Sequence, residues 1–592
     1  MRLRLALTVA LLSFPLAAQN SVQPPNPHFR NTAPGVPYVG TKVCGACHSD
    51  IAARYSRTAM GRSMSVGDNP ALAQAAIPFT IFDSQQSEYF EISRNGDALF
   101  QSQYALDREG HERFRQTWKI AYIMGSGENG IGFLIDRDGY LFEAPLSYYT
   151  RSRTWSFSPG YERHNYAFTR PVVVECTSCH SGRPRPLYGT RGRYQNPPFA
   201  ELAVGCENCH GPGGLHVIER RAAVPLTGPV DTSIVNPAHL SGWLSDNICM
   251  RCHQGGDVRV LQPGKHEADF RPGTQLDSVL AIFKVPLNHS GTDPQNVLLE
   301  HYFSMSLSKC YRASNGRLRC VSCHDPHTKP DGTQVAVYFR DRCMACHASQ
   351  PCKLSASERR RTEPADNCIA CHMPKRPVAT ITHAALTEHR IIARPQEPFP
   401  EEAFRASASG LIQITAGQGN ATAPASDITL FQAYATLVHS GHAEYRSRMS
   451  DVLGRLSRNS PNDPAVLSAL AREAAAKGTP EASKTAIEDF TRAIQSGSTE
   501  RDNFLMLAEL YRRSGQNARA VDILRRGLQT NPYAPEIPES LAALYVELED
   551  YRSARDMVRH GLNLFPGDVA LHALDQKIQS AMPDEASGNH LQ

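Results

Sequence analysis

Beyond its first residues, the 592-residue sequence lacks any apolar run long enough to cross a bilayer, which takes about 18 residues without charge. It also lacks a dominant charge, because 62 Lys and Arg against 58 Asp and Glu leave a net charge of +4. No block of like charge stands out, which argues against nucleic acid as a partner. The length exceeds what one hydrophobic core serves, so two or more domains are expected.

Cysteine is almost confined to one repeated pattern. Of the 16 cysteines, 14 belong to seven copies of C-x-x-C-H, in which two cysteines stand three positions apart and a histidine follows. The seven copies, called motifs 1 to 7 in chain order, are Cys44-Cys47-His48, Cys176-Cys179-His180, Cys206-Cys209-His210, Cys249-Cys252-His253, Cys320-Cys323-His324, Cys343-Cys346-His347 and Cys368-Cys371-His372.

This pattern is the attachment signature of haem c. Each thiol adds to one haem vinyl group, and the histidine becomes the proximal ligand of the iron. Structural zinc and redox dithiols are the alternatives. Zinc ribbons do not need a histidine after every cysteine pair, and thioredoxin-type dithiols do not occur in sevens. The sequence therefore predicts seven covalent haems c, with their irons, as cofactors.

Residues 1–18 have the pattern of a secretory signal peptide. Arg2 and Arg4 supply the positive start, the apolar stretch 5–16 is too short to span a bilayer, and Ala17 and Ala18 offer a cleavage site. A retained N-terminal anchor is the alternative. Export to the periplasm or another extracytoplasmic space agrees with haem attachment, and no membrane span is expected after cleavage of the signal.

Residues 19–398 are expected to form the haem domain, with a helix over 50–64. A cysteine-free, β-rich insertion at about 77–160 separates the first motif from the others. Strands are predicted at 77–82, 89–93, 99–104, 132–135 and 140–143. The insertion could shield a haem edge, provide a docking face, or serve only as a folding module.

Few long periodic segments lie between motifs 2 and 7. We expect sparse secondary structure there, because stacked porphyrins can replace the side-chain core. The Ala-, Ser- and Gly-rich stretch 399–426 reads as a linker. The predicted fold class is mainly α, with this haem-packed domain followed by a helical solenoid.

Residues 427–585 have the spacing of tetratricopeptide (TPR) repeats. Phe504, Leu507, Ala508 and Tyr511 open one unit, and the pattern returns 34 residues later from Leu541. A degenerate unit is predicted at 428–460 and a capping helix at 569–582. Such repeats present a concave surface for partner proteins, and the tail is expected to fold alone. A spacer or dimerisation unit is the alternative.

Several short segments resemble the multihaem c-type cytochromes with doubled C-x-x-C-H motifs. This group includes redox partners of hydroxylamine oxidoreductase and the multihaem nitrite reductases. The resemblance covers about 38–395 and implies extracytoplasmic electron transfer with mostly bis-histidine haems. Unlike catalytic nitrite reductases, this chain has no motif that ends in lysine. The segments are 38–43, 125–130, 158–161, 209–216, 323–327 and 371–375.

Distal iron ligands follow from geometry and from this resemblance. His216 and His327 stand too close in sequence to His210 and His324 to reach the opposite face of the same haem, so each should ligate a neighbouring haem. His301 resembles a ligand position of the family. The alternative for every candidate is a surface side chain, and for Met60 it is packing against a porphyrin. The remaining candidates are His389, His383, His164 and Met60.

Cys310 and Cys352 are the two cysteines outside the motifs. Because the expected compartment is oxidising, we predict that they form a disulfide; two buried free thiols are the alternative.

Together these features predict an exported electron relay whose TPR repeats bind a redox partner protein. One alternative is an oxidoreductase in which a single open haem acts on a small nitrogen or sulfur compound. The other is a TPR scaffold protein with an attached redox module.

The first testable prediction concerns haem content. Protein produced with a cytochrome c maturation system should gain seven haem masses, because each motif provides two thiols and a proximal histidine. Intact mass spectrometry measures the additions, and the chain made without that system is the control. Fewer than seven additions, with the remaining thiols free, would falsify the assignment.

Overall fold

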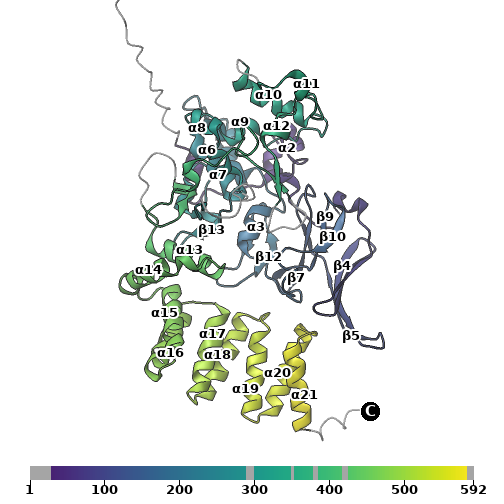
Figure 1. The fold of residues 1–592 in the computed structure, drawn as a ribbon, viewed down its shortest axis with the longest axis vertical. Coiled ribbons are helices and arrows are strands. Elements are labelled where there is room, and N and C mark those ends of the chain that lie inside the picture. Colours follow the sequence, from purple (N-terminus) through teal and green to yellow (C-terminus); the bar gives the residue numbers. More distant parts are fainter. Residues whose placement is uncertain are drawn as a thin grey trace, which may run out of the picture.

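Nine strands from Phe79 to Phe157 build the β-rich region of the computed structural model, which describes residues 28–67, 69–288, 299–348, 352–377, 385–416 and 424–582 (Figure 1). They form an antiparallel sheet of order β2-β3-β4-β5, most of a second sheet of order β1-β6-β7-β8, and a β9–β10 hairpin. The bounds are β1 Met64–Ser65, β2 Phe79–Asp83, β3 Glu88–Asn95, β4 Ala98–Leu106, β5 Glu112–Lys119, β6 Tyr122–Met124, β7 Gly132–Arg137, β8 Tyr140–Glu143, β9 Leu146–Tyr149 and β10 Thr154–Phe157.

The β-rich character expected from the sequence is confirmed, and all five predicted strands are present within a few residues. The sequence patterns did not predict strands β5, β6, β9 and β10. Strand β5 is rich in charge because its outer face is in solvent, and all four residues of β9 are buried, which removes the alternation that marks a half-buried strand. A shared core of Ile92, Phe133, Ile135 and Trp155 joins the sheets.

Each C-x-x-C-H motif lies on or beside a short helix. On a helix, positions i, i+3 and i+4 share one face, so both thiols and the imidazole can approach one ligand from the same side. The seven helices are α1 Thr41–Gly45, α3 Val174–His180, α4 Glu207–His210, α6 Gly242–His253, α9 Cys320–Cys323, α10 Val335–His347 and α12 Cys368–His372.

The helix predicted over 50–64 is wrong beyond its first half. Helix α2, Ser49–Tyr55, ends early, and a 3-10 turn begins at Met60. At Gly61 the chain folds back on the end of α2, where an added Cβ would lie 2.4 Å from the carbonyl oxygen of Tyr55. Only glycine allows this close approach.

The motif region contains more side-chain core than expected. Helices α6 and α7 (His301–Ser306), strand β14 (Leu280–Lys284) and nearby loops enclose Phe270, Leu276, Ile282 and Tyr302. Motifs 5 to 7 lie in a part of the chain with far less side-chain core. Among the described residues from 309 to 376, Ala336 alone is buried.

The stretch 399–426 is not a free linker where the structure describes it. Ala403 and Leu411 are fully buried, and strand β17, Ile412–Gln413, pairs with β14. The same sheet, completed by β13 (Val258–Leu261), packs against the first helices of the tail, so Phe283 shares one core with Phe431 and Tyr434. The tail beginning at 427 is therefore not a separate packing unit.

Helices from 427 onward stack in antiparallel pairs, as the repeat pattern predicted, and those from 464 onward run in a row below the motif region (Figure 1). Phe504, Leu507, Ala520 and Leu541 lie in their common core. The predicted degenerate unit and the capping helix are both present. The bounds are α13 Asp427–His439, α14 Arg446–Asn459, α15 Pro464–Lys477, α16 Pro480–Gln495, α17 Arg501–Arg513, α18 Asn517–Thr530, α19 Glu536–Glu547, α20 Tyr551–Leu564 and α21 Val569–Ala581.

Two loops between repeats attach the far end of this row to the β-rich region. Tyr533 packs edge-on against Tyr140 and Phe142, with ring centroids 5.1 and 4.9 Å away, and its hydroxyl lies 3.1 Å from a carboxylate oxygen of Asp138. One repeat later, Gly567 lies against Phe114. The solenoid is thus held at its beginning and again near its end. Within the described residues, no helix is long and apolar enough to cross a membrane.

This packing predicts where the tail can be cut. Residues 464–582 should form a soluble, haem-free, helical fragment, because repeats contact mainly their neighbours. A fragment that starts at 427 exposes the face of α13 that covers Phe283 and Leu411, so it should self-associate. Circular dichroism and sedimentation compare the two, and a monomeric, folded 427–582 fragment would contradict the shared core.

Candidate metal centres

The 16 cysteines are all free thiols, half-buried or exposed, and motif cysteines meet across different motifs. Cys44 of motif 1 lies within hydrogen-bonding reach of Cys206 of motif 3. Three further contacts of the same kind link motifs 2 and 4, motifs 4 and 5, and motifs 6 and 7. These pairs are Cys179–Cys252, Cys249–Cys320 and Cys343–Cys368.

Motif histidines face a second histidine at the spacing of a shared metal. The ring centroids of His48 and His216 are 6.4 Å apart with planes 20° from parallel. His210 and His327 are separated by 6.1 Å. Two imidazoles on opposite sides of one metal ion, each with a metal–nitrogen bond of about 2 Å, have centroids about 6 Å apart. Both pairs fit this spacing and are too far apart to stack directly.

Two further motif histidines have such neighbours. His324 and His389 are 6.2 Å apart. His253 and His301 approach to 5.3 Å with planes at 69°, and His301 also lies 4.6 Å from His389. The rings of His253, His301 and His389 are therefore closer to one another than they would be in two complete metal sites with an imidazole on each side.

Hydrogen bonds determine which ring nitrogen of these histidines is available to bind a metal. The Nδ1 of His210 lies 2.8 Å from the carbonyl oxygen of Val235, and the Nδ1 of His389 lies 2.9 Å from that of Thr387. A carbonyl oxygen only accepts, so Nδ1 carries the proton and the lone pair of Nε2 is free to bind a metal. His301 and His372 make the same type of contact, with His253 and Ile392.

His216 has an acidic partner instead. Its Nδ1 is 3.1 Å from a carboxylate oxygen of Asp231 and equally far from the Ser233 hydroxyl. Asp231 also accepts from the backbone of Ser233. A carboxylate behind a ligating histidine orients the ring and makes it more basic.

Burial keeps the central imidazoles neutral, which is the form that binds metal. Desolvation lowers the pKa of His301 to about 3 and that of His389 to about 4. The same cause lowers the pKa of His180, His210, His253 and His324. The donor set, with paired neutral imidazoles beside free thiols, fits covalently attached haem.

The remaining predicted ligands are His164, Met60 and His383. His164 is exposed and packs against Tyr166 at 4.6 Å. Met60 sits in the 3-10 turn after α2, and His383 lies outside the described residues. Within the described part of the chain, no ring contact pairs His180, His347 or His372 with a second imidazole.

The structure does not form the expected Cys310–Cys352 disulfide. Both thiols are free, and Cys352 is exposed.

The sequence patterns did not predict a polar cluster beside motif 2. Arg170 forms an ion pair of 2.5 Å with Glu143, yet burial outweighs the arginine and raises the pKa of Glu143 to about 7. The buried Tyr161 donates to the carbonyl oxygen of Glu143. The charges of Glu143 and Arg170 both act on Cys176. No local pattern marks these residues, since they come from separate strands and loops.

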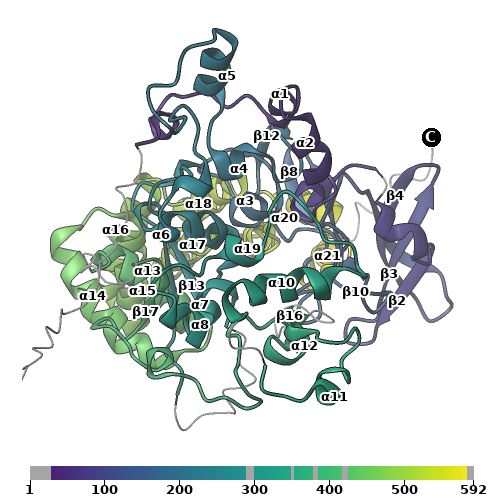
Figure 2. The ribbon, with the colours of Figure 1, turned by 90° about the horizontal axis from the view of Figure 1, so that it is seen from above.

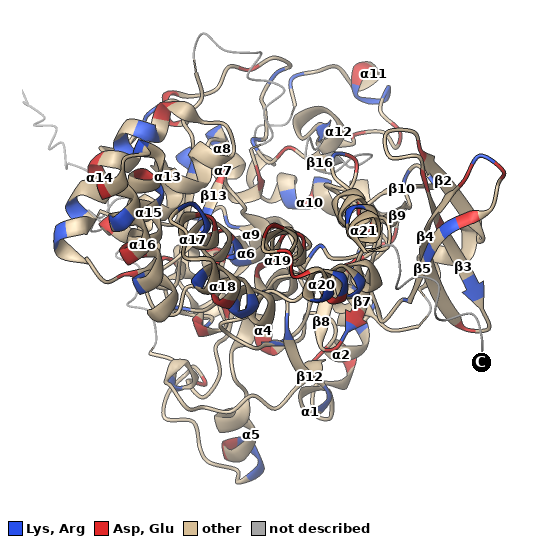
Figure 3. Cartoon of the chain, turned by 90° about the horizontal axis from the view of Figure 1, so that it is seen from below, with Lys and Arg blue, Asp and Glu red and all other residues tan. Residues whose placement is uncertain are grey.

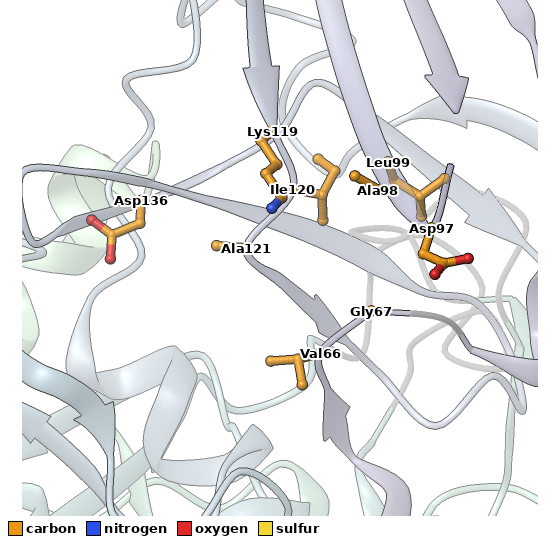
Figure 4. Close-up of a pocket in the computed structure, with 9 residues that line it drawn as sticks. All are labelled: Val66, Gly67, Asp97, Ala98, Leu99, Lys119, Ile120, Ala121 and Asp136. Carbon is orange, nitrogen blue, oxygen red and sulfur yellow. The ribbon is translucent and has the colours of Figure 1, made fainter. Parts of the chain in front are cut away.

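A cavity of about 520 Å³ opens in the β-rich region (Figure 4). Its charged lining groups are Asp97, Lys119 and Asp136, and neither cysteine nor histidine lines it. It is therefore separate from the motif constellation.

Comparison with known proteins supports the helical tail. A family model described as tetratricopeptide repeat matches residues 511–578. The chain is similar to the crystallised APC/C hetero-tetramer Cut9–Hcn1, with 18% identity, TM-score 0.22, 26% of this chain and 33% of that chain covered. It thus spans a third of that first relative.

Two further solved structures are similar. A thermophilic TPR protein of Thermus thermophilus matches with 17% identity, 27% and 84% coverage and TM-score 0.22. The Sgt2 TPR domain of Aspergillus fumigatus matches with 17% identity, 22% and 85% coverage and TM-score 0.19. No curated protein matches the chain. The family match and the paired helices make residues 511–578 part of a TPR domain.

The cysteine contacts make a prediction for the haem-free chain. The neighbouring thiol of Cys44 holds the pKa of Cys206 at about 7, whereas the pKa of Cys44 is raised far above its usual range. Because the thiolate is the nucleophile, iodoacetamide at pH 7 should modify Cys206 at least about ten times faster than Cys44.

Peptide mass spectrometry measures the two rates. In Cys44→Ala the hydrogen bond is lost, so modification of Cys206 should slow. Cys343→Ala, which alters a distant contact, is the control and should leave Cys206 unchanged. Equal reactivity of the two thiols in the unaltered chain would show that they are not neighbours.

Proposed function

We propose that the protein relays electrons through seven covalent haems outside the cytoplasm and binds a partner protein through its TPR domain. The observation that carries the relay is the pairing of motif histidines with second histidines that project from other motif segments. His48 with His216 and His210 with His327 have the separation of a two-sided metal site, and a proton on Nδ1 of His210 leaves its other nitrogen free.

The connections between motifs support a continuous path. Thiol contacts link motif 1 with 3, 2 with 4, 4 with 5, and 6 with 7. The charge of Cys249 acts on the thiol of Cys209, which links motifs 3 and 4. The charge of Cys346 acts on the thiol of Cys323, which links motifs 5 and 6. Bound haem supplies reversible one-electron chemistry at iron.

The residues of the chain hold that group in place and set its surroundings. The motif cysteines anchor it, while carbonyl oxygens and the Asp231 carboxylate orient the imidazoles. Buried side chains of the α6–α7 core support the helix that carries motif 4. Short spans such as 210–216 and 324–327 tie one motif to the next, which keeps neighbouring redox groups close.

The TPR domain supplies the binding function. TPR arrays generally bind proteins, and the row α15–α21 is fixed to the β-rich region through Tyr533. A partner held by this row would stay in a defined orientation to the motifs. Signal-peptide export, as the N-terminal sequence predicts, would place this assembly in the periplasm or its equivalent.

A catalytic haem at motif 2 is the second candidate function. No ring contact pairs His180 with a second imidazole among the described residues, while Glu143 and Arg170 act on Cys176 of the same motif and Tyr161 donates to Glu143. An arginine and a carboxyl group with a pKa of about 7 are suited to bind and protonate a small oxyanion. The resulting activity would be reduction of a small nitrogen or sulfur compound.

Carbon monoxide binding to the fully reduced protein tests the ligand pairs. His216→Ala should bind one more equivalent than the unaltered protein, because the iron opposite His48 loses its second ligand. His239→Ala, at an exposed position, is the control and should bind no more than the unaltered protein. Equal binding by His216→Ala would remove His216 from the ligand set.

The same titration separates the two functions. An unaltered protein that binds no carbon monoxide is a sealed relay. Rapid stoichiometric binding at one haem, with spectral changes on nitrite addition that Arg170→Gln weakens, would establish the motif 2 alternative instead.

A further inference from the structure

The apolar loop that follows helix α5, Gly214–Arg221, is exposed to solvent. All nine residues from 221 to 229 are exposed, and five of them in a row, 222–226, are Ala-Ala-Val-Pro-Leu. Val224 is 41% and Leu226 is 52% exposed, and Ile218 on the last turns of the helix is 64% exposed. We call Ile218 and 221–226 the α5 tip. Figures 2 and 3 both draw α5 projecting from the body on the side of α1.

The base of this projection is firmly attached. Arg30 forms an ion pair of 2.6 Å with Glu219, and Arg220 lies 3.6 Å from Asp231. At Gly214 an added Cβ would lie 2.7 Å from the carbonyl oxygen of Pro37, so the helix starts in close contact with the chain ahead of motif 1. The exposed apolar loop is therefore presented on a fixed support, and exposure of this kind marks an interaction site.

The support also carries a candidate ligand. His216 lies in the first turn of α5 and faces His48 of motif 1 at 6.4 Å. A molecule bound at the α5 tip would therefore lie only a few residues along α5 from His216, which faces His48 of motif 1. Motif 1 in turn contacts motif 3 through Cys44 and Cys206. The tip thus lies where one end of the motif chain reaches the surface.

We propose that the α5 tip is the docking site of a redox protein that has an apolar contact spot ringed by carboxylates; this rests on the proposed electron relay. Three arginines, Arg30, Arg220 and Arg221, stand against two carboxylates, Glu219 and Asp231, around the tip. Arg221 is exposed and forms none of the described ion pairs. An apolar centre with a charged rim is the usual composition of a transient protein interface, and charge complementarity speeds encounter.

Other occupants fit the tip less well. Membrane-surface helices carry many Lys and Arg opposite Trp, Phe and Leu, and 214–230 contains only two arginines and no Phe, Tyr, Trp or Lys. In a symmetric dimer the same patch of both copies would meet, which brings two arginine-bearing rims together. A protein with surface carboxylates complements that rim.

Stopped-flow reduction of the seven-haem protein tests this docking site. The double substitution Val224→Ser with Leu226→Ser should lower the second-order rate of reduction by reduced flavodoxin, a small acidic flavoprotein, by at least about tenfold. Reduction by dithionite, which needs no docking, should keep its rate. Arg221→Glu should also slow the flavodoxin reaction and weaken its dependence on salt.

Matched controls come from outside the tip and the TPR row, where Phe82 and Leu354 are 51% and 50% exposed. Phe82→Ser with Leu354→Ser should leave both reactions unchanged. An unaltered flavodoxin rate in the tip variant would overturn the docking site. So would tip-dependent binding to phosphatidylcholine and phosphatidylglycerol vesicles, or a tip-dependent dimer in sedimentation, in place of the kinetic effect. Absence of haem from the unaltered protein would instead remove the proposed function itself.

Discussion

Pairs of histidines from different motif segments account for much of the arrangement of the motif region. A motif histidine follows its cysteines on the same helix, and the ring that faces it comes from a segment elsewhere in the chain. His216 follows motif 3 but faces His48 of motif 1, and His327 follows motif 5 but faces His210 of motif 3. Each such pair brings two motifs together.

The rest of the chain supports this interlocked set. Helix α6 and strand β14 provide an apolar core around motif 4, whereas motifs 5 to 7 have almost no buried side chains of their own. The TPR row is attached at one end through the core shared by Phe283 and Phe431, and near the other through Tyr533. The TPR row is thereby held in a fixed relation to the motifs.

Local patterns predicted local structure well where one signal dominated. The repeat period placed the helices from 427 onward, because Phe504, Leu507 and Leu541 recur at the spacing of a helix pair. Prediction failed where a contact distant in sequence decided the outcome. Helix α2 stops at Tyr55 because Gly61 folds back on it, and Leu411, Ile414 and Thr415 are buried where Ile412–Gln413 pairs with β14.

By itself the sequence determined the seven motifs, the repeats and two histidines expected to face a neighbouring motif, because these depend on residue types at short spacings. His216 and His327 could be assigned to neighbouring motifs, since the chain between them and their own motif is too short. Which motif each would face was decided only by tertiary structure, as were the cluster of Glu143 with Arg170 and the free state of Cys310 and Cys352. Those outcomes depend on how strands and helices pack across long stretches of chain, and no local spacing encodes that packing.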